Sequence, residues 1–285
     1  MDKLENAQYA APTHRCLPSM PLPLADDVQD QLATDRFGRT MRGFEEVGST
    51  NTEAAEWAKD GAAEGSVVVT EYQSEGRGRH GRTWDAQKGQ NLMFSVVLRP
   101  AFQADRLGLI TIAASVAVAE AIDDFVSPHR AALKWPNDVL LEGRKTCGML
   151  LESSISNERA AAVVVLGVGL NVNQTDFPEP LVDTATSLRL ATGRPVPRAS
   201  LFARLLERLE TRYDTIQSGD DASVRSAFHD RLPPLYEHAT FRVPGTDRTI
   251  SGTVQGITET GALRLHTPDG PQTVHAGDVT SRRSP

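Results

Sequence analysis

The chain changes character at Pro233-Pro234. Before this pair, strand-like runs of apolar residues alternate with segments of helical spacing. Beyond about residue 237 only short strand-like runs remain, and turn dipeptides such as Asp269-Gly270 separate them. Dipeptides of this kind end strands and reverse the chain. The break therefore predicts two units, a larger one of helices and strands and a small C-terminal β-barrel.

The larger unit combines two kinds of apolar pattern. Residues 200–216 place their apolar side chains on one face, and residues 109–125 are apolar nearly all round, which predicts an amphipathic helix and a buried helix. Residues 66–70 and 161–168 are rich in β-branched side chains and predict strands. The expected fold class is α+β: a mixed β-sheet with packed helices over residues 25–235, then the β-barrel over residues 236–285.

Residues 1–24 carry several prolines and little periodicity, so we expect a loose N-terminal arm there. The rest of the chain divides into short elements that the apolar patterns and turn signals delimit. We expect helices at residues 26–34, 52–59, 109–125, 200–216 and 222–231, and strands at residues 40–46, 66–70, 92–98, 132–135, 139–142, 147–152, 161–168, 240–243, 249–255, 262–266 and 272–275.

The composition is that of an ordinary globular protein with an acidic balance. The 285 residues carry a formal net charge of −7, which makes the chain a poor general binder of nucleic acid. The two cysteines, Cys16 and Cys147, form no CxxC pair and fit a reducing compartment. No apolar run approaches the ~20 residues of a membrane span, and no secretory signal is visible. We therefore expect a cytoplasmic protein without membrane contact.

The densest polar feature is the segment 76–84, which reads GRGRHGRTW. Its glycines match the spacing of a dinucleotide-binding fingerprint, but that fingerprint requires a helix to follow, and here the next pattern is a strand. Glycines make the backbone permissive, and Arg77, Arg79 and Arg82 offer planar grips for phosphate or carboxylate. The pattern favours a mobile loop that closes over an anionic ligand. A solvated basic loop, or a loop that contacts nucleic acid, is the alternative.

Two further segments carry polar groups at the ends of predicted strands. Residues 134–138 read KWPND, and the Trp-Pro pair forces extended backbone, which places Asn137 and Asp138 at a turn. Asp138 is a candidate ligand for Mg²⁺, which favours one or two carboxylates plus phosphate oxygens. Residues 167–173 read GVGLNVN, so that a ligand can approach the backbone and contact Asn171. Taken alone, each segment has a plain structural alternative, a simple turn or a glycine-relaxed strand end.

Together, in this order and spacing, the three segments resemble the biotin–protein ligase family. Its marks are a GRGRxGRxW loop, a KWPND turn followed by a lysine, here Lys145, and a GxGxNxN strand exit. The resemblance covers about residues 40–283. It implies the class II synthetase-like fold of biotin and lipoate ligases with an SH3-like C-terminal barrel. It also implies that ATP activates biotin to biotinyl-5'-AMP, from which biotin passes to a lysine of a biotin carboxyl carrier protein domain.

The resemblance assigns roles to individual residues. Arg77, Arg79 and Lys145 are expected to be catalytic, and Lys145 would meet the biotin carboxylate and then the α-phosphate. Asp138 would serve Mg²⁺. The residues expected at biotin are Ser49, Thr50, Asn51, Gln73, Arg77, Gly78, Arg79 and Lys145, and those expected at ATP and the adenylate are Arg79, Arg82, Trp84, Asn137, Asp138 and Asn171.

Two other functions stay open at this level. A lipoate or octanoate ligase or transferase shares the catalytic fold but is expected to lack the arginine-rich loop and the C-terminal module. A biotin-sensing DNA-binding regulator is expected to carry a winged helix-turn-helix before residues 49–51, where we see no basic recognition helix. We expect ATP, Mg²⁺ and biotin as ligands, a carrier domain as partner, no DNA, and a monomer or homodimer.

Overall fold

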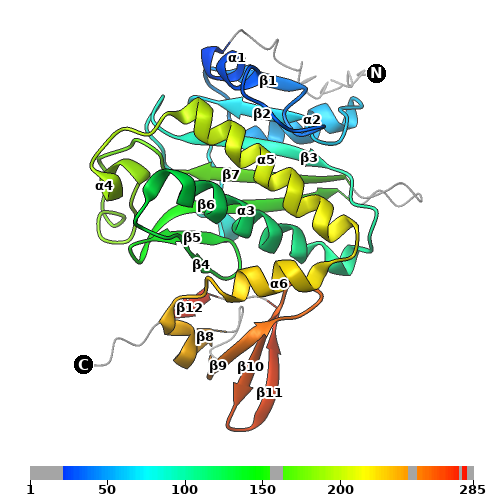
Figure 1. The fold of residues 1–285 in the computed structure, drawn as a ribbon, viewed down its shortest axis with the longest axis vertical. Coiled ribbons are helices and arrows are strands. Elements are labelled where there is room, and N and C mark those ends of the chain that lie inside the picture. Colours follow the sequence, from blue (N-terminus) through cyan, green and yellow to red (C-terminus); the bar gives the residue numbers. More distant parts are fainter. Residues whose placement is uncertain (1–21, 155–162, 243–248, 276–277, 281–285) are drawn as a thin grey trace, which may run out of the picture.

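The computed structural model describes residues 22–154, 163–242, 249–275 and 278–280. Figure 1 shows a larger unit of sheet and helices above a smaller, all-β unit. Within the described residues, no helix is long and apolar enough to cross a membrane. The predicted α+β class and the C-terminal β-module are both confirmed.

A mixed seven-stranded sheet forms the centre of the larger unit, in the order β1-β2-β3-β7-β6-β5-β4. Only β1 and β2 pair in parallel; every other neighbouring pair is antiparallel. The strands are β1 Met41–Phe44, β2 Val67–Thr70, β3 Leu92–Leu98, β4 Ala132–Lys134, β5 Asp138–Leu141, β6 Arg144–Ser154 and β7 Val163–Leu170.

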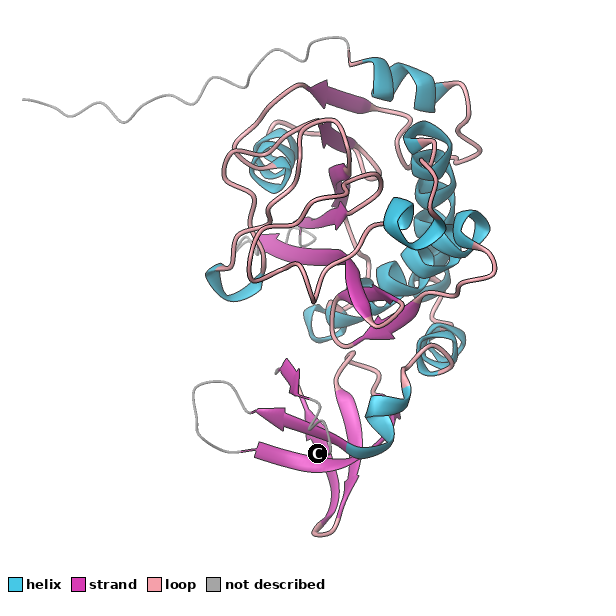
Figure 2. Ribbon diagram, turned by 90° about the vertical axis from the view of Figure 1, so that its left-hand side faces the viewer, coloured by secondary structure: helices cyan, strands magenta, loops and turns pink. Residues whose placement is uncertain are grey.

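Helices cover both faces of this sheet. The long helices α3 Gly108–Val126 and α5 Arg198–Gln217 gather on one side of it (Figure 2). The helix α2 Thr50–Lys59 lies on the other side, where Trp57 packs with the outward-facing strand residue Val68. Because α3 packs against the sheet and also against α5 and α6, it is buried on most of its surface, which explains why its sequence is apolar nearly all round.

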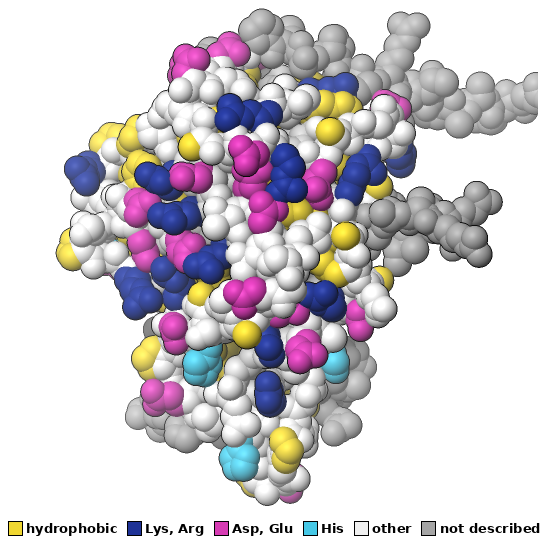
Figure 3. All heavy atoms as spheres, turned by 45° about the vertical axis from the view of Figure 1, so that its right-hand side comes forward, with side chains coloured by type: hydrophobic (Ala, Val, Ile, Leu, Met, Phe, Trp, Pro, Cys, Tyr) yellow, Lys and Arg dark blue, Asp and Glu magenta, His cyan; other side chains and the backbone are white. Residues whose placement is uncertain are grey.

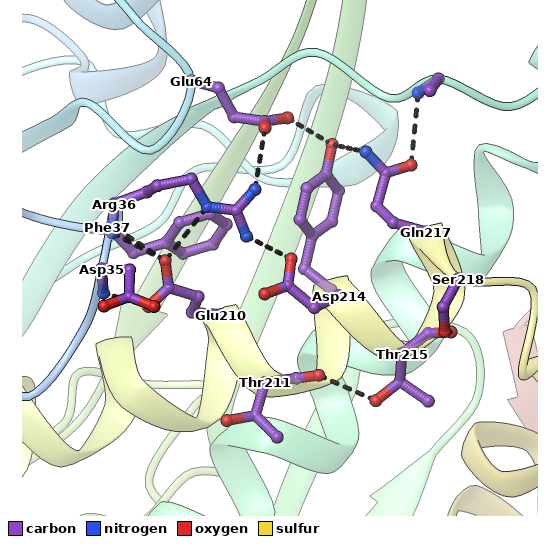
Figure 4. Close-up of polar contacts among 12 residues, drawn as sticks. Asp35, Arg36, Phe37, Glu64, Glu210, Thr211, Asp214, Thr215, Gln217 and Ser218 are labelled. Carbon is purple, nitrogen blue, oxygen red and sulfur yellow. Dashed lines mark hydrogen bonds and ion pairs between the residues drawn. The ribbon is translucent and has the colours of Figure 1, made fainter.

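A polar network fixes the chain segment before β1 to helix α5 (Figure 4). The carboxylate of Glu210 accepts hydrogen bonds from the backbone N–H groups of Asp35 and Arg36, both at 2.8 Å. The Arg36 guanidinium pairs with Glu64 at 3.3 Å and also with Asp214. These contacts join segments that lie far apart in the sequence, so the network holds the edge of the sheet against the helical layer.

The C-terminal unit is a five-stranded sheet in the order β11-β10-β9-β8-β12. It follows α6 Asp221–His229 and the short 3-10 helix Pro234–His238. Its inward residues Phe241, Leu263 and Leu265 are fully buried. The strands are β8 Ala239–Arg242, β9 Thr249–Ile257, β10 Leu263–Thr267, β11 Gly270–Val274 and β12 Asp278–Thr280.

The N-terminal predictions need correction where the structure describes them. The helix expected at residues 26–34 is α1 Pro23–Gln29, which begins earlier because Pro23 suits the first turn of a helix. Leu22 and Leu24, placed in the loose arm, are buried, and Leu22 packs so closely on β1 that a Cβ on Gly43 would lie 2.6 Å from it. Residues 1–21 lie outside the described residues.

Other element boundaries shift by one or a few residues. The helix expected at residues 52–59 begins at Thr50, with Ser49 as its N-cap residue but without a side-chain capping bond. The strand expected at residues 147–152 is longer in the structure, where β6 spans Arg144–Ser154. The sequence patterns missed the short helix α4 Leu188–Thr192 and the strand β12.

Candidate active site

The arginine-rich segment 76–84, called the arginine loop from here on, folds as a narrow hairpin. The backbone N–H of Trp84 donates to the Gly76 carbonyl at 2.9 Å, and that of Gly78 donates to the Arg82 carbonyl at 2.7 Å. A single 3-10 turn, Arg79–Gly81, forms its tip. No helix follows the glycines, which confirms the rejection of the dinucleotide fingerprint.

One cavity of about 640 Å³ lies beneath the arginine loop. The ends of several sheet strands and the start of α2 contribute to its walls, so residues distant in sequence share it. All the site residues predicted from the sequence line this cavity: Ser49, Thr50, Asn51, Gln73, Arg77, Gly78, Arg79, Arg82, Trp84, Asn137, Asp138, Lys145 and Asn171.

The start of helix α2 supplies one end of the cavity. The Gln73 side-chain oxygen accepts hydrogen bonds from the Thr50 backbone N–H at 2.7 Å and from its hydroxyl at 3.1 Å. These bonds fix the orientation of the Gln73 amide, so its NH₂ group is available to the cavity. The buried hydroxyl of Ser95 lies 2.7 Å from the Thr50 hydroxyl and 2.6 Å from the Asn51 side-chain oxygen. This end therefore carries neutral hydrogen-bonding groups with fixed directions.

Lys145 and Trp84 mark another part of the cavity wall. The Lys145 Nζ lies 2.6 Å from Asp138 Oδ1 and 5.6 Å from the centre of the Trp84 ring. Trp84 lies flat against two glycines: a Cβ on Gly169 would lie 2.5 Å from Trp84 Cε2, and one on Gly148 would lie 3.0 Å from Cζ3. Gly148 of β6 and Gly169 of the GVGLNVN segment therefore make room for the indole ring.

The KWPND segment follows the prediction at Asn137 and departs from it at Asp138. Asn137 is buried in the turn; its side-chain oxygen accepts from Arg79 at 3.0 Å and its NH₂ donates to the Met149 carbonyl at 2.8 Å. Asp138 is the first residue of strand β5 rather than a turn residue, because its backbone pairs with Gly148 of β6. That pairing points its carboxylate at Lys145.

Asn171 lies at the end of strand β7 and is 3% exposed. Its NH₂ group donates to the Thr186 carbonyl at 3.1 Å. Its side-chain oxygen has no hydrogen-bond partner among the described residues. A buried acceptor without a partner at a cavity wall is suited to receive a donor from a ligand.

The sequence patterns missed two side chains that hold lining residues of the cavity in place. Ser95, in the middle of a buried strand, contacts Thr50 and Asn51. Glu152, near the end of β6, contacts Asn51 and Arg77, and neither Ser95 nor Glu152 lies within a recognisable motif. A segment after β7 also lines the cavity and pairs with β6 on both sides of Lys145: the Lys145 N–H donates to the Thr184 carbonyl at 2.8 Å, and the Thr186 N–H donates to the Lys145 carbonyl at 2.9 Å. Only the folded arrangement reveals them.

Asp138, the predicted ligand of Mg²⁺, lines the cavity with its carboxylate paired to Lys145. Within the described residues, no three His, Cys, Asp or Glu side chains gather closely enough to hold a metal by themselves. A single carboxylate fits the way Mg²⁺ binds when a phosphate substrate supplies most of the oxygens. The donor set therefore fits a metal ion that enters with a phosphate ligand.

Comparison with known proteins agrees with this geometry. Residues 43–171 match the family described as "Biotin/lipoate A/B protein ligase family", and residues 242–281 match "Biotin protein ligase C terminal domain". The biotin–[acetyl-CoA-carboxylase] ligase of Mycobacterium tuberculosis is 34% identical over 262 residues, which cover 90% of this chain and 94% of that protein. The chain belongs to the biotin/lipoate A/B protein ligase family.

Other members of the biotin/lipoate A/B protein ligase family share sequence and shape with the chain. The bifunctional ligase/repressor BirA of Bacillus subtilis is 32% identical, with 89% of this chain and 77% of that protein covered. The biotin protein ligase of Aquifex aeolicus, solved in complex with biotin and ATP, superposes with a TM-score of 0.73 at 28% identity, covering 86% of this chain and 100% of that one. Membership in the family is therefore supported for both units of the chain.

Proposed function

We propose that this protein activates biotin with ATP and transfers it to a lysine of a biotin carboxyl carrier protein domain. The observation that carries the proposal is the joint match of both units: the catalytic match is shared with lipoate ligases, but the C-terminal match is to biotin protein ligases. The cavity agrees, because it combines a neutral hydrogen-bonding end with a cationic wall. The lipoate alternative explains only the first of these matches.

In the first half-reaction the biotin carboxylate attacks the α-phosphorus of ATP. A bond forms between a carboxylate oxygen and phosphorus, and the bond from the α-phosphorus to the bridging oxygen breaks, so pyrophosphate leaves. Arg77, Arg79 and Lys145 surround this reaction with positive charge. Cations held in place before the reaction lower its barrier because they need no reorganisation in the transition state. Lys145 bridges the reacting carboxylate and the α-phosphate oxygens.

In the second half-reaction the neutral amine of the acceptor lysine attacks the acyl carbon of biotinyl-5'-AMP. A carbon–nitrogen bond forms, the carbon–oxygen bond to phosphate breaks, and AMP leaves while the amine loses a proton. No enzyme nucleophile is needed, so positioning and electrostatics account for the catalysis.

The neutral end of the cavity suits the ureido ring of biotin. The oriented NH₂ of Gln73, together with Ser49, Thr50 and Asn51, offers donors and acceptors to a ring that carries both. Arg77, Gly78 and Arg79 cover biotin from the arginine loop. The adenylate lies against Arg82, Trp84, Asn137 and Asn171, where the unpartnered Asn171 oxygen accepts from the nucleotide. Mg²⁺ bound to the ATP phosphates would contact Asp138 and offset their negative charge.

A cytoplasmic location follows from the chemistry of the substrates, since ATP and carrier domains must both be at hand. The two cysteines, distant in sequence, fit a reducing compartment. We expect the protein to act as a monomer or a homodimer.

The experiment that tests the proposal measures pyrophosphate release from ATP with biotin, with lipoate and with neither. We expect release that depends on biotin, and only background with lipoate. Equal release with both acids, or a preference for lipoate, overturns the proposal in favour of a lipoate ligase.

A further inference from the structure

Glu152 joins three parts of the molecule through one oxygen atom. It lies on strand β6, and its Oε2 accepts a hydrogen bond from the Asn51 NH₂ at 2.7 Å and one from the Arg77 guanidinium at 3.1 Å. Asn51 belongs to helix α2 at the floor of the cavity, and Arg77 belongs to the arginine loop that covers it. The carboxylate therefore connects the cover of the cavity to its floor.

The Asn51 amide is held in a single orientation by this contact. Its NH₂ faces Glu152 and, at 3.4 Å, the Leu150 carbonyl, while its oxygen accepts from the Ser95 hydroxyl. The amide lies directly over Gly167, where a Cβ would lie 2.1 Å from the Asn51 oxygen. Without the carboxylate, the NH₂ of Asn51 would lose its only charged acceptor in the described part of the chain.

Global stability is a poor explanation for the pair of Arg77 and Glu152. Their side chains are 47% and 42% exposed. Ion pairs this exposed contribute little to stability, because water and salt screen the attraction. Arg77 also donates to the Thr52 hydroxyl at 3.2 Å, so its guanidinium is held between α2 and β6. The effect of such a pair is to restrict where the arginine, and hence the loop, can lie.

We propose that Glu152 is a positioning residue that anchors the arginine loop to the floor of the biotin end of the cavity, before any ligand binds. The anchor keeps Arg77 beside Asn51 and sets the amide orientation of Asn51. For its effect on biotin, this inference rests on the function proposed above. The anchoring itself concerns the unliganded protein and can be measured without substrates.

The first measurement is limited proteolysis of the unliganded protein with trypsin, which cleaves after arginine. The loop offers cleavage sites at Arg77, Arg79 and Arg82, and mass spectrometry identifies which bond is cut. We expect the loop to be cut several times faster in Glu152→Ala than in the wild-type protein, because local opening becomes more frequent when an anchor is lost. Glu152→Gln, which keeps an accepting oxygen but no charge, gives an intermediate rate.

Glu45→Gln is the matched control, because Glu45 forms an exposed ion pair with Lys88 at 3.2 Å and does not line the cavity. In Glu45→Gln, trypsin is expected to cut the arginine loop at the wild-type rate. Equal rates in wild type, Glu152→Gln and Glu45→Gln would overturn the proposal, even if Glu152→Ala failed to fold.

The second measurement separates positioning from a general structural role. In biotin-dependent pyrophosphate release, we expect Glu152→Ala to raise KM for biotin about tenfold and to leave kcat largely intact. A tenfold effect is at the low end of what loss of a charge-assisted hydrogen bond costs, because this bond is half exposed. Arg77→Ala combined with Glu152→Ala should raise KM by clearly less than the product of the two single effects, since the two substitutions remove one shared contact.

An unchanged KM for biotin in a folded Glu152 variant, or additive effects in the double variant, would overturn the positioning role. If the wild-type protein releases no pyrophosphate with biotin, the proposed function fails, and the trypsin result still decides whether Glu152 anchors the loop.

Discussion

Lys145 lies between an acid and an aromatic ring. Its ammonium group is paired with Asp138 and faces the Trp84 ring, and its side chain is 35% exposed to the cavity side. Backbone bonds from the segment after β7 hold the residue on both sides. A cation held in this way is ready for a developing negative charge without first having to reorganise.

Replacing Lys145 with alanine should therefore stop the first half-reaction. We expect the rate of biotinyl-adenylate formation to fall about 10²- to 10³-fold, the usual cost of removing one preorganised electrostatic group. Single-turnover formation of the adenylate from labelled ATP measures this rate. Lys88→Ala, at the exposed ion pair with Glu45, serves as the control and should keep the wild-type rate. Wild-type adenylation by Lys145→Ala would contradict the role of Lys145.

At the scale of elements, strand β6 carries much of the site. It bears Lys145, Glu152 and Gly148, the glycine that packs against Trp84. It lies between β5 and β7 in the sheet. It also bears Cys147, a free cysteine that is fully buried among the residues of the main core. Burial raises the pKa of the Cys147 thiol, and the nearby Lys145 only partly opposes this effect.

The raised pKa of Cys147 predicts how stability changes with pH. The unfolded chain loses the thiol proton above its ordinary pKa of about 8.5, but the folded chain keeps it, so folding is favoured below that pH and loses stability as pH rises above it. From pH 7.5 to 9.5, the unfolding free energy of the wild type should fall about 1 to 1.5 kcal/mol more than that of Cys147→Ala. Urea denaturation at both pH values measures this difference; parallel changes in the two proteins would refute it.

The elements that could be predicted from the sequence are those with a long, regular pattern. Helices α3 and α5 and strand β3 follow the apolar periodicity closely, since burial of one or all faces dictates it. Helix α4 is too short to show a period, and β12 is held mainly by its pairing with β8. Short elements depend on tertiary contacts that no local pattern records.

Site residues could be predicted where they stand together in the sequence. The arginine loop, the KWPND turn and Asn171 could be found because their residues are contiguous and chemically unusual. Ser95 and Glu152 could not, because each acts through a partner more than forty residues away in sequence. The sequence also misplaced Asp138, since a single carboxylate beside a turn gives no sign that strand pairing begins there.

At the scale of the whole molecule, Trp135 connects the two units. Its backbone N–H donates to the Tyr236 hydroxyl at 2.8 Å and its indole N–H donates to the Gly261 carbonyl at 2.9 Å. Its ring also forms a T-shaped contact with the ring of Phe241 of β8. Because Trp135 precedes Asn137 and Asp138, the C-terminal unit supports the turn that carries part of the site.

Removing the Tyr236 hydroxyl should weaken this junction. In Tyr236→Phe the buried N–H of Trp135 loses its acceptor, so we expect the free energy of unfolding to fall by about 1 to 3 kcal/mol. Urea denaturation measures the loss. Tyr72→Phe is the control, since the Tyr72 hydroxyl makes no hydrogen bond within the described part of the chain, and its stability should stay at the wild-type value. Equal stability of the two variants would contradict the proposed support.

Acidic and basic side chains are mixed on one face of the molecule. On the face shown in Figure 3, acidic and basic side chains are interspersed and form no extended patch of one sign. The net charge of −7 disfavours general electrostatic attraction to nucleic acid. A carrier domain is instead expected to be recognised by shape and local contacts close to the arginine loop.

The most direct test of the whole account is mass spectrometry of a biotin carboxyl carrier domain incubated with this protein, ATP and biotin. We predict that the carrier gains one biotinyl group, and that the gain disappears when ATP is omitted or when the acceptor lysine of the carrier is replaced by arginine. A carrier that stays unmodified with biotin, or that gains a lipoyl group instead when lipoate is supplied, would contradict the account.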